Sequence, residues 1–137
     1  MRVQPIVDIL DGLGTFRQVD GALAFADLEN MFKVTPAAFV LPTGERAGEN
    51  RLVGAQDQRV GVEFSVVLCL SASQRQRGQV PETLHDRAAE VIDAITGQTH
   101  PDMIQANQYV GGKLINVTAG HLFWQITFST AYRIRKV

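Results

Sequence analysis

The sequence has one cysteine, no long apolar run and no excess of either charge. The single cysteine, Cys69, excludes a disulfide within the chain and fits folding in a reducing cytoplasm. No apolar stretch reaches the roughly 18 residues of a membrane-spanning helix, and no apolar segment after Arg2 forms a signal peptide. Thirteen basic and fourteen acidic residues argue against nucleic acid as the main partner. With 45% hydrophobic residues, the composition predicts one globular domain over residues 1–137.

Recognisable motifs for catalysis, metal binding and phosphate binding are also missing. His85, His100 and His121 stand far apart and lack the spacing of zinc ligands. No G-x-S-x-G motif presents a serine nucleophile on a sharp turn. The run Gly111-Gly112-Lys113 lacks the upstream glycine and the following Ser or Thr of a phosphate-binding loop. We therefore expect no cofactor, no metal site and no enzymatic activity.

Two long segments alternate between apolar and polar residues. Every even position from Arg59 to Ala72 is apolar, and the even positions from Leu122 to Arg135 are mostly apolar or aromatic. This alternation predicts two long β-strands, each with one buried face. At about 3.3 Å per residue each strand reaches roughly 45 Å, whereas a usual strand has about 5–6 residues. We expect the excess length to serve contacts with other subunits.

The two faces of these strands have different predicted environments. The even positions, which include Trp124 and Tyr132, are expected in the core, under the helices. The opposite face is only weakly apolar. We expect its Val67, Cys69 and Phe123 to meet a neighbouring subunit.

Periodicity predicts the remaining elements. Apolar residues at helical spacing predict helices over residues 3–13, 22–32 and 81–96. Further strands are predicted over residues 36–42, as an edge or first strand, and over 108–118, with a bulge at Gly111-Gly112; residues 16–19 are a short strand or a connection. The polar segment 43–58 is expected to protrude as a loop. The fold class is therefore α+β: two layers, with a mainly antiparallel sheet of about four strands, two of them long, against two or three helices.

The polar face of the helix over residues 81–96 carries a row of carboxylates, interrupted by Arg87. Its members are Glu82, Asp86, Glu90 and Asp93. The row is either the solvated side of an amphipathic helix or, in a ring of subunits, the lining of a channel. Such a lining would repel DNA phosphates and keep a passing duplex from adhering.

The order of elements, the size and the segment GKLINVTAGHLFWQITFSTAYRI (residues 112–134) resemble the tail terminator proteins of long-tailed bacteriophages. The resemblance implies a sheet packed against helices and a structural role without catalytic residues. It implies a hexameric ring that caps the head-proximal end of the tail tube, ends its polymerisation and receives the head connector. The implied partners are other copies of the chain, the tail tube protein and a connector or neck protein. DNA would pass through the lumen without specific binding, and the protein would be assembled in the host cytoplasm and reside in the virion, away from any membrane.

Tail terminators use extended loops for subunit and partner contacts, which by position implicates residues 43–58 and 74–78. The candidate contact residues are the charged ones in these segments: Glu45, Arg46, Glu49, Arg51, Asp57, Arg75 and Arg77. Two alternatives stay open: another neck or head–tail joining protein, and a small oligomeric α+β enzyme or ligand-binding protein with a site between subunits.

Overall fold

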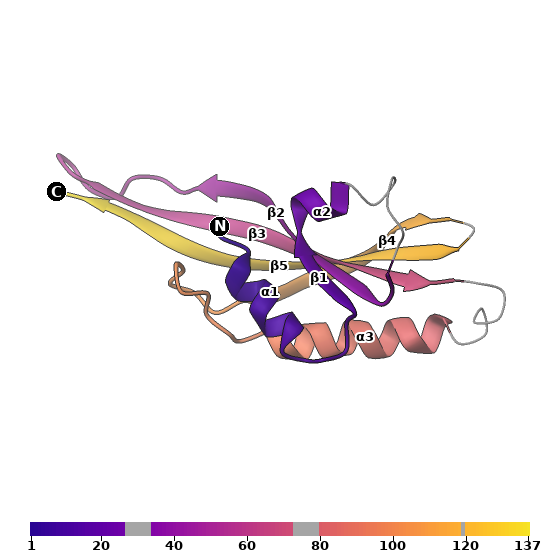
Figure 1. The fold of residues 1–137 in the computed structure, drawn as a ribbon. Helices are drawn as coiled ribbons and strands as arrows, with labels where there is room; N and C mark the ends of the chain where they lie inside the picture. The colour runs from indigo at the N-terminus through magenta and orange to yellow at the C-terminus, as the bar shows by residue number, and fades with distance from the viewer. Residues whose placement is uncertain (27–33, 73–79, 119) are drawn as a thin grey trace.

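The computed structural model describes residues 1–26, 34–72, 80–118 and 120–137 (Figure 1). Within these residues the strands are β1 (Gln18–Gly21), β2 (Ala37–Ala47), β3 (Gln56–Ser71), β4 (Gln108–Val117) and β5 (His121–Lys136), and the helices are α1 (Gln4–Asp11), α2 (Ala22–Ala26) and α3 (Val80–Ile95). The strands form one sheet in the order β1-β2-β3-β5-β4. The predicted α+β class is confirmed. The sheet has five strands rather than four because residues 18–21 pair with β2 in parallel.

The centre of the sheet is the antiparallel pair of β3 and β5. The two strands pair along their whole length, from Gln56 opposite Lys136 to Ser71 opposite His121. The even positions of β3 from Val60 to Leu70 are buried, as the alternation predicts. This long pair holds the rest of the sheet in register.

The main core lies between the sheet and the two helices α1 and α3, which share one side of the sheet (Figure 1). The rings of Phe64 on β3 and Phe128 on β5 stack with their centroids 5.4 Å apart. From α1, Ile6 and Leu10 enter this core, one helical turn apart on the same face. Trp124 is partly buried and packs against the core, as predicted. Each helix thus covers the sheet with a single apolar stripe.

The short helix α2 packs on part of the opposite face of the sheet, which corrects two predictions. The ring of Phe25 lies 5.6 Å from that of Phe39 and 6.4 Å from that of Phe123. Val67, Cys69 and Phe123 are buried in this second cluster, so they pack within their own chain. The prediction that the helices cover one face of the sheet is wrong. The ring of Phe25 packs against Phe39 and Phe123 on the second face, which places α2 there. The remainder of the predicted helix over 22–32 lies outside the described residues.

Strand β2 is longer than predicted and is not confined to a sheet edge. Its first four residues, Ala37–Val40, lie between β1 and β3, while its later residues pair with β3 alone. Pro42 lies in the second part, where β2 has β3 as its single neighbour. The N–H that proline lacks is therefore not needed to bond a second strand. A register shift between Pro42 and Gly44 marks a bulge at this change.

Candidate assembly interface

One end of the sheet extends beyond the helices as an arm, which we define as residues 43–60 with 132–137 (Figure 1). The prediction of a loop over 43–58 is wrong in its extent. Residues 43–47 continue β2, residues 56–58 begin β3, and only residues 48–55 connect the two strands. Residues 43–47 are all exposed, so no buried face produces the alternation that reveals a strand.

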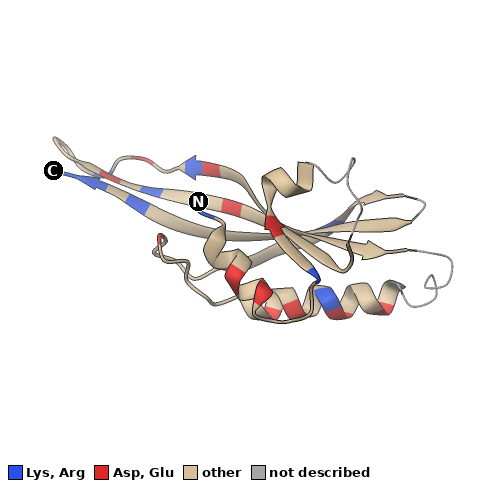
Figure 2. Cartoon of the chain, viewed as in Figure 1, with Lys and Arg blue, Asp and Glu red and all other residues tan. Residues whose placement is uncertain are grey.

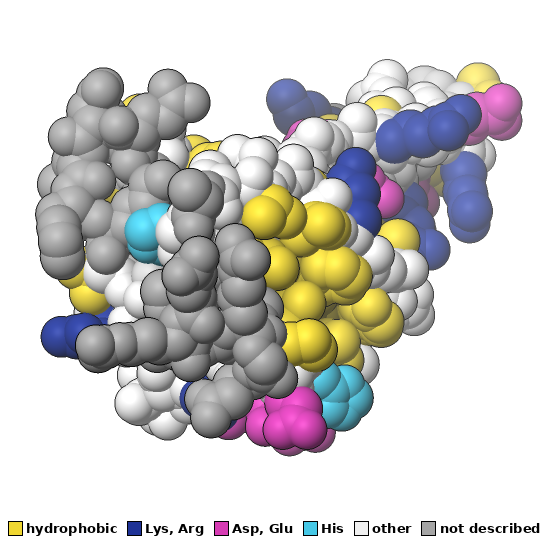
Figure 3. Space-filling view, turned by 90° about the vertical axis from the view of Figure 1, so that its right-hand side faces the viewer, with side chains coloured by type: hydrophobic (Ala, Val, Ile, Leu, Met, Phe, Trp, Pro, Cys, Tyr) yellow, Lys and Arg dark blue, Asp and Glu magenta, His cyan; other side chains and the backbone are white. Residues whose placement is uncertain are grey.

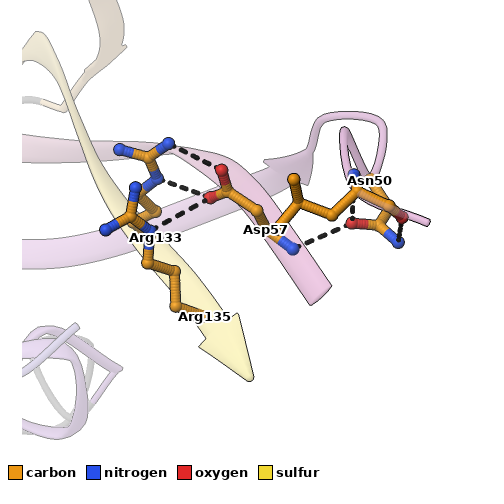
Figure 4. Close-up of polar contacts among 5 residues, drawn as sticks. Asn50, Asp57, Arg133 and Arg135 are labelled. Atoms are coloured by element: carbon orange, nitrogen blue, oxygen red, sulfur yellow. Dashed lines mark hydrogen bonds and ion pairs between the residues drawn. The ribbon is translucent and has the colours of Figure 1, made fainter. Parts of the chain in front are cut away.

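The connection at the arm tip is organised by the side chain of Asn50 (Figure 4). Its Nδ2 donates hydrogen bonds to the carbonyl oxygens of Leu52 and Ala55, at 3.0 and 2.9 Å. Its Oδ1 accepts from the backbone N–H groups of Leu52 and Asp57, at 3.3 and 2.8 Å. Asparagine is well suited to bonding its neighbouring backbone in this way. The tip therefore has a defined shape although it is exposed.

Asp57 fixes the base of the connection to β5 (Figure 4). Its carboxylate accepts hydrogen bonds from Nε and a terminal nitrogen of Arg133, at 2.6 and 2.7 Å, and lies 3.6 Å from Nε of Arg135. The bidentate bond to Arg133 lowers the pKa of the Asp57 carboxyl and raises the pKa of Arg133. Asp57 is buried, so its visible role is to hold the arm together.

The other candidate residues of the arm lie on its surface. Glu45 accepts a hydrogen bond of 3.0 Å from the hydroxyl of Tyr132, which raises the pKa of Tyr132. Tyr132 is partly buried and lies on the arm. The prediction that it lies in the main core is wrong. Arg46, Glu49 and Arg51 are exposed. The predicted candidates Arg75 and Arg77 lie outside the described residues.

Charge is distributed unevenly over the molecule (Figure 2). The arm has six basic and three acidic residues, and Arg51, Arg59 and Arg133 line a cavity of about 150 Å³ with Asp57. The helices α1 and α3 carry the carboxylates of Asp8 and Asp11 and the predicted acidic row, against Arg87 alone. The arm is thus a basic projection, and the helical layer is an acidic surface.

The acidic row on α3 is only partly available for external contacts. Glu90 accepts a hydrogen bond of 2.8 Å from the hydroxyl of Thr15 and lies 3.4 Å from Arg87. It therefore links α3 to the segment that follows α1. Glu82, Asp86 and Asp93 are exposed.

Strand β4 forms the other edge of the sheet and exposes apolar side chains. Its register shifts twice, between Tyr109 and Gly111, close to the predicted bulge, and between Leu114 and Asn116. The exposed apolar residues, at 39–56% of full accessibility, are Tyr109, Val110, Leu114, Ile115 and Val117. Tyr109, Leu114 and Val117 pair with the even positions Phe128, Trp124 and Leu122 of β5, so they share the face that carries the main core, while Val110 and Ile115 are the unpaired bulge residues. Sequence reasoning missed this surface, because the two bulges shift the alternation that would reveal which side chains are exposed.

A groove lies between α3 and the strands β4 and β5, where Figure 3 shows apolar side chains gathered beside acidic ones. Its volume is about 350 Å³, and its apolar lining includes Leu84, Ala88, Ile92, Tyr109 and Trp124. A Cβ on Gly112 would lie 2.9 Å from Nε1 of Trp124, so glycine lets the indole lie against β4. The groove is suited to an aliphatic side chain rather than to a charged ligand.

The described histidines and other potential metal ligands lie as follows. No group of three His, Cys, Asp or Glu side chains in the part of the chain that the structure describes could hold a metal ion. His100 is buried, with Nε2 donating to the carbonyl of Arg2 at 2.7 Å and Nδ1 accepting from the N–H of Asp102 at 3.0 Å. His85 lines the groove. Among the described helices, none is long and apolar enough to cross a membrane.

A family model described as "Phage tail terminator protein" matches residues 1–136. No curated protein matches the chain.

Proposed function

We propose that this chain, which belongs to the phage tail terminator family, forms a hexameric ring on the head-proximal end of the tail tube. The family is one of structural proteins, so the chain is a structural component of a phage tail and of the virion. In our proposal the ring ends polymerisation of the tube and offers its opposite face to the head connector. Assembly takes place in the host cytoplasm.

The observation that carries an assembly role is the arm. It extends past both helices that cover the main core, yet Asn50 and Asp57 hold it in a defined shape. Ordering an exposed ribbon costs conformational entropy that little core burial offsets. A contact with another chain would offset this cost by burying the arm in an interface.

The molecule has two surfaces of opposite charge, which supports closure of a ring. A ring forms when one surface of each copy binds a different surface of the next and the rotation closes. The basic arm and the acidic helical layer are such a pair of unlike surfaces. A basic arm bound to the helical layer would engage the exposed carboxylates of Glu82 and Asp86 and leave that of Asp93 to face the lumen, where a carboxylate lets DNA pass without specific binding.

The test replaces residues 49–58 by Asn-Gly, a two-residue turn that closes a hairpin. The variant should retain a cooperative urea transition, because the main core is untouched. Tails assembled with it should exceed normal length or fail to join heads, as measured by negative-stain microscopy. Normal-length tails joined to heads would refute the proposed role of the arm.

A mixing experiment separates this function from that of another neck protein. Purified protein is added to tail tubes and, separately, to DNA-filled heads. Rings with six subunits on tube ends support the terminator role. Binding to heads alone would instead identify a head-joining protein.

A further inference from the structure

The tip of the arm presents apolar side chains in an otherwise polar segment. Leu52 is 47% exposed, and Val53 is completely exposed. Both lie inside the turn that Asn50 organises, and both follow the basic residue Arg51. Because the turn is already fixed, these two side chains lose little further conformational freedom on entering a partner's groove, and Arg51 adds a charge that can pair with an opposite charge there.

The groove between α3 and β4 has the complementary properties. Its volume of about 350 Å³ is roughly ten times the share of one water molecule in the liquid, ~30 Å³, so it has room for an aliphatic side chain. Glu82 and Asp86 are exposed on the helix that forms one wall. An apolar tip carrying Arg51 therefore matches this groove in both hydrophobicity and charge.

The tip and the groove lie at opposite ends of the sheet (Figures 1 and 3). The tip of one molecule therefore cannot reach the groove of the same molecule. The alternative pairing of tip with tip would bring two basic arms together. Tip-to-groove contact is heterologous, which is the kind of contact that closes rings.

We infer that the Leu52–Val53 tip of one copy binds the α3–β4 groove of the next copy. This inference rests on the proposed function, because it names the surfaces through which the ring closes. The exposed apolar edge of β4 extends the contact beyond the groove. The occupant of the groove is thus a second copy of this chain.

Cysteine crosslinking tests the contact in assembled protein, alone and on tail tubes. Chains carrying both Val53→Cys and Ala89→Cys are treated with a short bismaleimide; Ala89 is exposed and lines the groove. We expect a ladder of covalent oligomers up to the ring size. An equal mixture of the two single variants should stop at dimers. The pair Val53→Cys with Asp20→Cys, placed on β1, is the matched control and should give no ladder.

Val53→Asp provides an independent measurement. A charge at the tip should weaken self-association roughly tenfold or more in sedimentation, because burial of an aliphatic group is lost and a charge must be desolvated. Leu23→Asp, at another highly exposed apolar residue, should leave self-association unchanged.

The outcomes separate this inference from the proposed function. Rings on tube ends without the ladder, or crosslinking of Val53→Cys to itself, would overturn the tip-to-groove contact and leave the terminator role intact. Failure to form rings or bind tubes in the wild-type chain would overturn both.

Discussion

Replacing Asn50 by Ala should loosen the arm without unfolding the core. The substitution removes two hydrogen bonds that Nδ2 donates and two that Oδ1 accepts. At a net ~0.5–1.5 kcal/mol each, and with water replacing part of the loss at this exposed site, we expect about 1–3 kcal/mol of local destabilisation. This corresponds to a roughly 5- to 150-fold larger equilibrium constant for opening of the arm tip.

Native-state hydrogen exchange measures this opening residue by residue. The amides of Leu52 and Asp57, which bond to Asn50, and of Arg51, which bonds to the carbonyl of Asp57, should exchange faster by this factor. Amides in the middle of β3 should exchange at the wild-type rate. Gln58→Ala is the matched control, because it removes only the bond of 3.1 Å to the carbonyl of Gly48.

Two results would refute this reasoning. Unchanged exchange in the tip would mean that Asn50 does not organise the connection. Equal acceleration in the tip and in β3 would mean that the arm and the core open as one unit. Tail lengths measured with the same variant then show whether an ordered tip is needed to end the tube.

Three further perturbations follow from the packing and the ion pairs. Phe64→Ala should lower the free energy of unfolding by about 3–5 kcal/mol in urea, because it empties the centre of the main core; a smaller loss than Ile-to-Val changes usually cause would contradict this core assignment. Gly112→Ala should cost about 1–3 kcal/mol, since its Cβ would overlap the indole of Trp124, whereas Gly111→Ala meets nothing within 4 Å and should change stability little. Asp57→Asn should destabilise the arm at neutral pH. The lowered pKa of Asp57 means that its contribution is complete above the ordinary aspartate pKa of ~3.9 and is lost as the pH falls through the lowered value. Hydrogen exchange of wild type and variant should therefore converge in acid, and a difference that persists at low pH would refute the assignment.

The sequence predicts those elements best that have one buried face and sufficient length. The alternation in residues 59–72 and 122–135 identifies β3 and β5, because each strand has one face against the main core. The apolar stripe of α3 identifies the helix for the same reason. In each case burial against one partner leaves a periodic pattern.

Elements without such a pattern are missed or misplaced. Strand β1 has four residues and pairs in parallel with β2, so it is too short to show a period. The role of α2 depends on Phe25 reaching Phe39 and Phe123, which are distant in sequence. The apolar residues Val67 and Cys69 indicated a buried second face, but not which chain covers it.

The arm network could not be predicted because it depends on strand register. Asp57 was a candidate for external contacts because it is charged and lies in a polar segment. Only the pairing of β3 with β5 brings it beside Arg133 and Arg135. By contrast, the exposed character of Arg46, Glu49 and Arg51 follows from composition alone.

The order of the strands also has a consequence for synthesis on the ribosome. Strand β5 follows the four other described strands in the sequence, yet it lies between β3 and β4 and pairs with the full length of β3. Until β5 emerges, one side of β3 has no hydrogen-bonding neighbour and half of the sheet cannot close. A nascent chain therefore cannot complete the sheet that carries both the arm and the groove until β5 has been synthesised, so neither surface is available for assembly before then.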